Sequence, residues 1–222
     1  MPSRPVSYPP PITIPALGPP TDPSRSARFI FINGLGDDAS GLETNTPAWY
    51  TPTSLTSSHP ELDDDEDNEG IKTSTIYVVS LIDGLISQGI PLNRIIIGGF
   101  SQGCAMSLIV GLTSKYAGKL GGIVSLSDYL PLADKISALR EEAELTPHVD
   151  NKVPMFLARG TRDMMIPKRY CRIAYETLFG LGVKREVARI KEYEGMGHVM
   201  SGAVLRDLCA WLEEVVGVDK GS

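Results

Sequence analysis

Short runs of apolar residues alternate along the chain with longer segments in which apolar residues recur every three or four positions. The short runs, such as Phe29–Ile32 and Ile95–Ile97, have apolar side chains on both faces, which is typical of strands buried in a parallel sheet. The longer segments have the period of amphipathic helices. We therefore expect strands at residues 29–32, 94–98, 122–126, 153–159 and 186–193, and helices at residues 71–90, 101–115, 167–181 and 199–216.

This alternation of strand and helix predicts the architecture. Buried strands that alternate with helices form a mostly parallel sheet with helices on both faces. We therefore predict a single α/β domain over residues 29–217, followed by a short tail at residues 218–222. Residues 1–28 contain nine prolines, which remove backbone donors and favour an extended chain. For this segment we expect a flexible N-terminal tail.

Composition narrows the function classes. The 222 residues have a net charge of −6 without a cluster of Lys and Arg, which argues against a nucleic-acid or anionic-membrane surface. Three scattered cysteines are too few for a disulfide framework or a zinc site. The N-terminus lacks the apolar core of a secretory signal, and no apolar run approaches the roughly 20 residues that span a bilayer. We expect a cytoplasmic protein.

Two further features have ordinary explanations. The acidic run at residues 61–69 is typical of a solvated loop that leads into a helix, because a helix N-terminus favours negative charge. We predict no metal site there. The glycines near residues 34–36 do not form a phosphate-binding loop, because no third glycine follows at the required spacing.

The strongest local signal is Gly99-Phe100-Ser101-Gln102-Gly103. It fits the pattern Gly-x-Ser-x-Gly and lies between a predicted strand and a predicted helix, the context that this motif requires. The glycines remove Cβ atoms that would collide in a tight turn, and the helix N-terminus favours a developing oxyanion. A structural turn is the alternative interpretation of these five residues alone. In this context we predict that Ser101 is a catalytic nucleophile.

A serine hydroxyl needs a base to become a good nucleophile, and the chain has three histidines. His59 lies in an acidic loop and His148 in a polar connection, where both are most simply solvated. His198 follows the last predicted strand, so it lies at the carboxyl edge of the sheet, where Ser101 also emerges. A loop histidine with glycine neighbours is poorly explained as a core residue. We predict that His198 is the base.

The base in turn needs a carboxylate that fixes its tautomer. Asp163 follows the strand at residues 153–159 and lies at the same edge of the sheet. The resulting order Ser, Asp, His is that of the α/β-hydrolase fold. Asp128, which follows the preceding strand, is the alternative acid. We predict a triad of Ser101, Asp163 and His198 in an α/β-hydrolase fold.

The loop Asn33-Gly34-Leu35-Gly36-Asp37 follows the first buried strand. Its glycines allow backbone N–H groups to point inward, although an ordinary glycine turn would be the better interpretation without Ser101. We assign the oxyanion hole to the backbone N–H groups of Leu35 and Gln102. Each such donor is typically worth about 10²–10³ in rate.

Five segments, in the same order, resemble the acyl-protein thioesterases of the phospholipase/carboxylesterase family. The longest is the nucleophile region, Gly89-Ile90-Pro91-Leu92-Asn93-Arg94-Ile95-Ile96-Ile97-Gly98-Gly99-Phe100-Ser101-Gln102-Gly103, and it is highly specific. The resemblance extends over about residues 27–216. The other segments are Gly34–Asp37, Leu126–Leu132, Gly160–Asp163 with Ile166-Pro167, and Tyr193–His198.

The resemblance implies hydrolysis of fatty-acyl thioesters on protein cysteines without a cofactor. The acyl chain would lie in an apolar groove near Leu35 and the loop Leu130-Pro131-Leu132. Expected partners are S-acylated proteins such as small GTPases or G-protein α subunits, and membrane contact would occur only through the lipidated substrate. The nucleus is a second expected compartment, and a weak homodimer is an open alternative to a monomer.

The chain departs from the family at three places. Asn33 replaces a histidine, and Thr51 replaces an aspartate after the Trp-aromatic pair. A helix and a strand are absent between Gly41 and Pro47, which would expose one side of strand Phe29–Ile32. A divergent family member or an imperfect gene model would each explain this loss.

Three functions therefore remain open from the sequence. A depalmitoylating thioesterase is the first hypothesis. A carboxylesterase or lysophospholipase that acts on oxyesters is the second. The third is a catalytically impaired binding protein with the hydrolase fold, in which the oxyanion loop is displaced.

Overall fold

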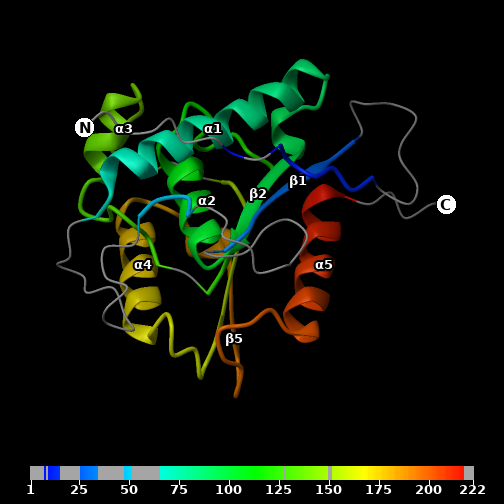
Figure 1. Cartoon of the computed structure of the whole chain (residues 1–222), viewed down its shortest axis with the longest axis vertical. Coiled ribbons are helices and arrows are strands. Elements are labelled where there is room, and N and C mark those ends of the chain that lie inside the picture. Colours follow the sequence, from blue (N-terminus) through cyan, green and yellow to red (C-terminus); the bar gives the residue numbers. More distant parts are fainter. Residues whose placement is uncertain are drawn as a thin grey trace.

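The computed structural model describes residue 8 and residues 10–15, 26–34, 48–51, 66–127, 129–149 and 152–217. In this part of the chain, strands and helices alternate from β1 to α5 (Figure 1). The elements are β1 (Arg28–Ile32), α1 (Asn68–Ser87), β2 (Ile95–Phe100), α2 (Gln102–Thr113), β3 (Gly122–Leu126), α3 (Ile136–Glu142), β4 (Met155–Gly160), α4 (Lys168–Gly180), β5 (Ala188–Tyr193) and α5 (Gly202–Val216).

The strands form one parallel sheet in the order β1-β2-β3-β4-β5. At its carboxyl edge Ile32 pairs with Gly99, Phe100 with Leu126, and Gly160 with Tyr193. Because every strand runs in the same direction, the loops that follow the strands meet along this one edge. The predicted parallel α/β sheet with helices on both faces is confirmed.

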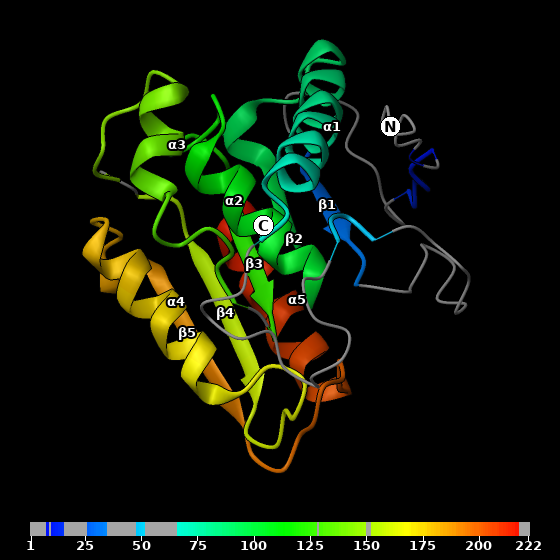
Figure 2. The same cartoon turned by 60° about the vertical axis from the view of Figure 1, so that its left-hand side comes forward.

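Different helices cover the two faces of the sheet. Helix α5 lies on one face, where Trp211 and Leu208 pack against Ile96 and Phe156. Helices α1 to α4 lie on the other face, as Figure 1 shows, and Figure 2 gives the same arrangement from a second direction. Successive side chains of a strand point to opposite faces of the sheet. Ile95 and Ile97 therefore belong to the larger apolar cluster, on the side of α1 to α4, whereas Ile96 belongs to the smaller cluster under α5.

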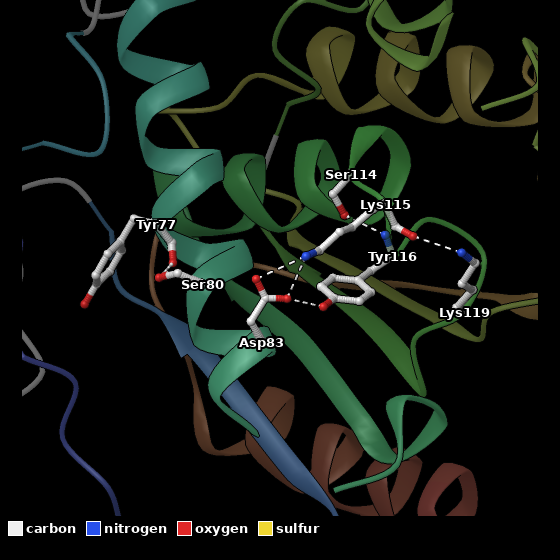
Figure 3. A network of polar contacts seen from close by, with 7 residues as sticks. All are labelled: Tyr77, Ser80, Asp83, Ser114, Lys115, Tyr116 and Lys119. Atoms are coloured by element: carbon white, nitrogen blue, oxygen red, sulfur yellow. Dashed lines mark hydrogen bonds and ion pairs between the residues drawn. The ribbon is translucent and has the colours of Figure 1, made fainter. Parts of the chain in front are cut away.

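Helix α1 is fixed at both ends. At its start Asp67 accepts hydrogen bonds from the backbone N–H groups of Gly70 (2.9 Å) and Thr51 (2.8 Å), which makes it the N-cap of the helix. Near its other end Asp83 pairs with Lys115 (Nζ–Oδ1 2.9 Å) and accepts from the Tyr116 hydroxyl (Figure 3). These exposed contacts tie α1 to the segment that follows α2.

The structure differs from the sequence-based expectation in a few places. Helix α3 was not expected. Residues 185–187 form a 3₁₀ turn, so that β5 begins at Ala188. Within the tail, residues 10–15 form neither helix nor strand. The predicted loss of a helix and a strand between Gly41 and Pro47 falls on residues that the structure does not describe. The predicted division into a tail at 1–28, a domain at 29–217 and a tail at 218–222 stays a prediction.

Candidate active site

Ser101 lies in a strained turn between β2 and α2. Its backbone has φ 54° and ψ −125°, a conformation that residues with a side chain rarely adopt and that clusters at functional sites. Ser101 is the N-cap of α2, yet its side chain makes no capping hydrogen bond. Instead its backbone N–H donates to the carbonyl of Leu126 on β3 (2.9 Å). The strained turn therefore presents the Ser101 hydroxyl without using it to cap the helix.

The two glycines of the motif are required by contact with the end of β1. A Cβ at Gly99 would lie 2.3 Å from the carbonyl oxygen of Ile32. A Cβ at Gly103 would lie 2.0 Å from that same oxygen and 2.6 Å from the carbonyl oxygen of Asn33. No real Cβ approaches backbone so closely. The glycines therefore allow the loop that leaves β1 to lie directly against the serine turn.

Asp163 and His198 form the predicted pair. His198 Nδ1 lies 2.9 Å from Asp163 Oδ2, and the Asp163 side chain is fully buried while His198 is 17% exposed. The other carboxylate oxygen, Oδ1, accepts from the backbone N–H groups of Met165 (3.0 Å) and Ile166 (2.9 Å). An ionised carboxylate only accepts hydrogen bonds, so the proton lies on Nδ1, and Nε2 of His198 remains basic.

The surroundings keep Asp163 ionised. Burial alone would raise the pKa of the Asp163 carboxyl, but hydrogen bonds from His198, the N–H of Ile166 and the Ser127 side chain hold that pKa below its ordinary value. Ser127 is itself in the left-handed region (φ 54°), with its N–H bonded to the carbonyl of Ala158 (2.8 Å). Ser127 lies in one of the segments that resemble the family, but only the structure shows that it follows β3 and supports the acid.

Close contacts bring together the three segments that carry Ser101, Asp163 and His198. The Phe100 ring lies 4.6 Å from the His198 ring, centroid to centroid, and Phe100 directly precedes Ser101. A Cβ at Gly160 would lie 2.0 Å from the carbonyl oxygen of Met196, so the loop with the acid packs against the loop with the histidine. The structure therefore brings all three predicted triad residues to one edge of the sheet.

Of the two predicted oxyanion donors, Gln102 is within the described residues and Leu35 is not. The backbone N–H of Gln102 is at the first position of α2, where the helix offers it no carbonyl acceptor. Leu35 lies outside the described residues, as do the alternative acid Asp128 and His59. The assignment of the oxyanion hole to Leu35 and Gln102 stays a prediction.

The Gln102 side chain has a role that the sequence did not reveal. Its Nε2 donates to the Tyr50 carbonyl (2.9 Å), and its Oε1 accepts from the Trp49 N–H (2.9 Å). The Trp49 indole N–H in turn donates to the carbonyl of Asn33 (3.0 Å). The pair Trp49-Tyr50 is visible in the sequence, but only its contacts show that it joins the serine turn to the β1 loop.

Of the residues expected to line the acyl groove, Leu35 lies outside the described residues and the other three are buried. Leu130 and Leu132 belong to the large apolar cluster, and Pro131 is buried beside them. Leu132 adopts a left-handed backbone (φ 52°), and its N–H donates to Glu66 Oε2 (2.5 Å). A role for Leu130, Pro131 and Leu132 in binding an acyl chain stays a prediction.

Other kinds of site have little support in the described residues. There, no three His, Cys, Asp or Glu side chains are grouped so as to hold a metal ion. No helix in the same part of the chain combines the length and the apolar character needed to cross a bilayer.

The sequence as a whole decides the family. The profile of the phospholipase/carboxylesterase family matches residues 21–216. The chain belongs to this family. The family resemblance expected from the motifs is thereby confirmed, and the protein is an enzyme, a carboxylic ester hydrolase.

The chain is also similar to acyl-protein thioesterases over most of its length. The chain is 32% identical over 234 residues to acyl-protein thioesterase 1 of Yarrowia lipolytica, and the alignment covers 90% of this chain and 96% of the relative. It is 33% identical over 221 residues to acyl-protein thioesterase 1 of Neurospora crassa, with 85% and 84% covered. Among solved structures, Zea mays acyl-protein thioesterase 2 has the same fold, with a TM-score of 0.70, 20% identity, and 92% and 97% of the two chains covered.

Proposed function

We propose that this protein is a serine hydrolase that cleaves fatty-acyl thioesters on protein cysteines. The observation that carries the proposal is the Asp163–His198 hydrogen bond beside the strained turn of Ser101. The similarity to acyl-protein thioesterases of Yarrowia lipolytica and Neurospora crassa supports the choice of a thioester as substrate.

The geometry supports a two-step mechanism through an acyl-enzyme. Ser101 Oγ attacks the thioester carbonyl while His198 Nε2 takes the serine proton. Asp163 holds Nδ1–H and stabilises the imidazolium. The tetrahedral intermediate collapses, the cysteine sulfur leaves with the proton from His198, and the acyl group remains on Ser101.

The second step returns the enzyme to its starting state. His198 takes a proton from water, the resulting hydroxide attacks the acyl carbonyl, and Ser101 leaves with the proton. In both steps the negative oxygen would be stabilised by the backbone N–H groups of Gln102 and Leu35. None of these steps needs a cofactor.

The partners and the compartment belong to the same proposal. The protein substrates would be S-acylated proteins at a membrane surface, of the kind represented by small GTPases and G-protein α subunits. The enzyme would act in the cytoplasm, with the nucleus as a second compartment, and would meet the membrane through the lipidated substrate.

Labelling with a fluorophosphonate, followed by peptide mass spectrometry, tests the nucleophile. We expect a single modified residue, Ser101, with no labelling in Ser101→Ala and slow labelling in His198→Ala. Ser80→Ala is the matched control, because Ser80 is exposed on α1 and its hydroxyl donates to a carbonyl of its own helix (Tyr77, 2.7 Å). A folded wild-type protein that is not labelled would contradict the proposal.

A second measurement tests the substrate class. Turnover of a palmitoyl-cysteine peptide is compared with turnover of a short oxyester at equal enzyme concentration. We expect a higher kcat/KM for the palmitoyl thioester. A preference for the short oxyester would instead make the protein a carboxylesterase that uses the same Ser101.

A further inference from the structure

Trp49 is bonded through all three of its polar groups, and each bond leads to a different element. Its backbone N–H donates to the Gln102 side chain at the start of α2 (2.9 Å). Its indole N–H donates to the carbonyl of Asn33, just after β1 (3.0 Å). Its carbonyl accepts from the hydroxyl of Ser74 on α1. Trp49 therefore fixes the β1 loop relative to the helix that begins after the serine turn.

This junction involves both segments to which the oxyanion hole is assigned. The two donors assigned to the hole are the N–H of Gln102 and the N–H of Leu35, which is two residues beyond Asn33 in the β1 loop. A shift of Trp49 would change the position of the Asn33 carbonyl and of the Gln102 side chain together. Because oxyanion donors act only when they are held in place before the reaction, the position of Trp49 matters for the rate of the chemical step.

Tyr8 belongs to the proline-rich N-terminal segment, far from this junction in sequence, yet it packs on it. Its ring stacks on that of Tyr77 (4.2 Å between centroids, 15° between planes) and on that of Trp49 (5.6 Å, 19°). Its hydroxyl lies 2.7 Å from Ser74 Oγ. Since the Ser74 hydroxyl donates its only proton to Trp49, Tyr8 donates to Ser74.

The site that receives Tyr8 is distinct from the polar network around Asp83 on the same helix. Tyr77 projects from α1 away from the network around Asp83 (Figure 3). Burial, with a smaller contribution from Tyr8, raises the pKa of Tyr77 above its ordinary value, which agrees with a ring partly withdrawn from water. Tyr8, Tyr77 and Trp49 thus form a stacked aromatic group with Ser74 at its edge.

We propose that Tyr8 is a positioning residue for the oxyanion hole and acts through Trp49. It holds the Trp49 ring by stacking, and it orients the Ser74 hydroxyl that binds the Trp49 carbonyl. The segment predicted to be a flexible tail therefore contributes to catalysis without touching the substrate. The inference rests on the proposed acyl-enzyme chemistry of Ser101, but not on the identity of the protein substrate.

Three variants of the full chain test this role. Tyr8→Ala removes the stacking and the hydrogen bond, and Tyr8→Phe removes only the hydrogen bond. Ile14→Ala is the control, because Ile14 lies in the same segment and is 86% exposed. For each, kcat and KM are measured with p-nitrophenyl butyrate, together with the fluorophosphonate labelling rate, thermal unfolding and tryptophan emission.

We expect Tyr8→Ala to lower kcat and the labelling rate about three- to tenfold with KM unchanged, since the lost contacts are worth about one hydrogen bond. Tyr8→Phe should lie between Tyr8→Ala and wild type, and it stays informative if Tyr8→Ala folds poorly. Tryptophan emission should change in Tyr8→Ala, because Trp49 loses its stacking partner, and Ile14→Ala should match wild type.

Other outcomes overturn the inference. Unchanged kcat and labelling in Tyr8→Ala would show that Trp49 keeps its position without Tyr8. A raised KM with unchanged kcat would show that Tyr8 affects substrate binding and not the oxyanion hole. In both cases a labelled wild type leaves the proposed function standing, whereas an unlabelled wild type would overturn that function and this inference with it.

Discussion

Asp163 presents only one of its two carboxylate oxygens to His198. Oδ2 lies 2.9 Å from His198 Nδ1, whereas Oδ1 accepts two backbone N–H groups, from Met165 and Ile166. The backbone thus sets which oxygen faces the imidazole. This division of roles determines what an amide at position 163 would do.

Asp163→Asn should reverse the hydrogen bond to His198. The backbone N–H groups of Met165 and Ile166 require an oxygen, so the amide NH₂ of the asparagine would face Nδ1. His198 would then carry its proton on Nε2 and could not accept from Ser101. We expect kcat to fall on the order of 10⁴-fold. Ester turnover and the fluorophosphonate labelling rate measure this, and a loss below tenfold would mean that another carboxylate, such as Asp128, is the acid.

Gly103→Ala should separate the β1 loop from the serine turn. The new Cβ would lie 2.0 Å from the Ile32 carbonyl oxygen, which is backbone and cannot rotate away. If displacement of the β1 loop removes one oxyanion donor, fluorophosphonate labelling should slow about 10²–10³-fold.

The control for Gly103→Ala is Gly84→Ala in helix α1, where a Cβ would meet no atom of the described residues within 4 Å. This change should stabilise the protein by about 0.5–1 kcal/mol and leave the labelling rate unchanged. Equal labelling rates in the two variants would contradict the predicted role of the glycine at position 103.

Gly160→Ala should break the contact between the loops of the acid and the base. A Cβ at position 160 would lie 2.0 Å from the Met196 carbonyl oxygen and 2.7 Å from that of Gly197, directly before His198. We expect a loss of kcat that approaches the loss in Asp163→Asn, since the Asp163–His198 bond would be disrupted. The control is Gly180→Ala at the end of α4, where a Cβ would have no neighbour within 4 Å in the part of the chain that the structure describes. This variant should keep wild-type turnover.

Glu66→Gln should stabilise the protein at neutral pH. Burial raises the pKa of the Glu66 carboxyl above its ordinary value, against the opposing hydrogen bond from the Leu132 N–H. Between the ordinary and the raised pKa the native state binds more protons than the unfolded state, so its free energy of unfolding falls as pH rises. A glutamine has no charge to bury, and its carbonyl can still accept from Leu132.

The melting temperature, measured against pH, tests the prediction for Glu66. The wild-type melting temperature should drop as pH rises through the raised pKa, and Glu66→Gln should remove that part of the drop. Glu69→Gln is the matched control, because Glu69 is exposed in the first turn of α1. A Glu66→Gln variant that is less stable than wild type at pH 7 would show that the charged form is needed.

The sequence predicts the three triad residues, because the position of each one in the chain determines where it lies in a parallel sheet. Ser101 sits in a local motif, and Asp163 and His198 each follow a recognisable strand, so parallel pairing alone brings them to one edge. Helix α3 escaped prediction because it has only seven residues, of which two, Ile136 and Arg140, are buried. A stretch this short does not establish a helical period.

The contacts around Trp49 could not be predicted for a different reason. They depend on side chains from segments far apart in the chain, and no periodic pattern relates Tyr8 to Ser74 or Gln102. The prolines around Tyr8 favour an extended chain, and this composition says nothing about one aromatic ring that packs elsewhere. Ser127 is similar, because its left-handed backbone becomes visible only in the structure.

The pairing of β1 with β2 has a consequence for refolding. Arg28 pairs with Ile95, whereas Ile96 pairs with Gly122 and Ile123 with Met155. The other neighbours in the sheet are thus joined by much shorter connections, and docking β1 requires the longest loop closure, with the largest loss of chain entropy. The loop that leaves β1 lies against the serine turn, so the active site is complete only after β1 has docked. After dilution from denaturant, esterase activity should therefore return later than helical content, and the delay should equal the time that β1 takes to dock.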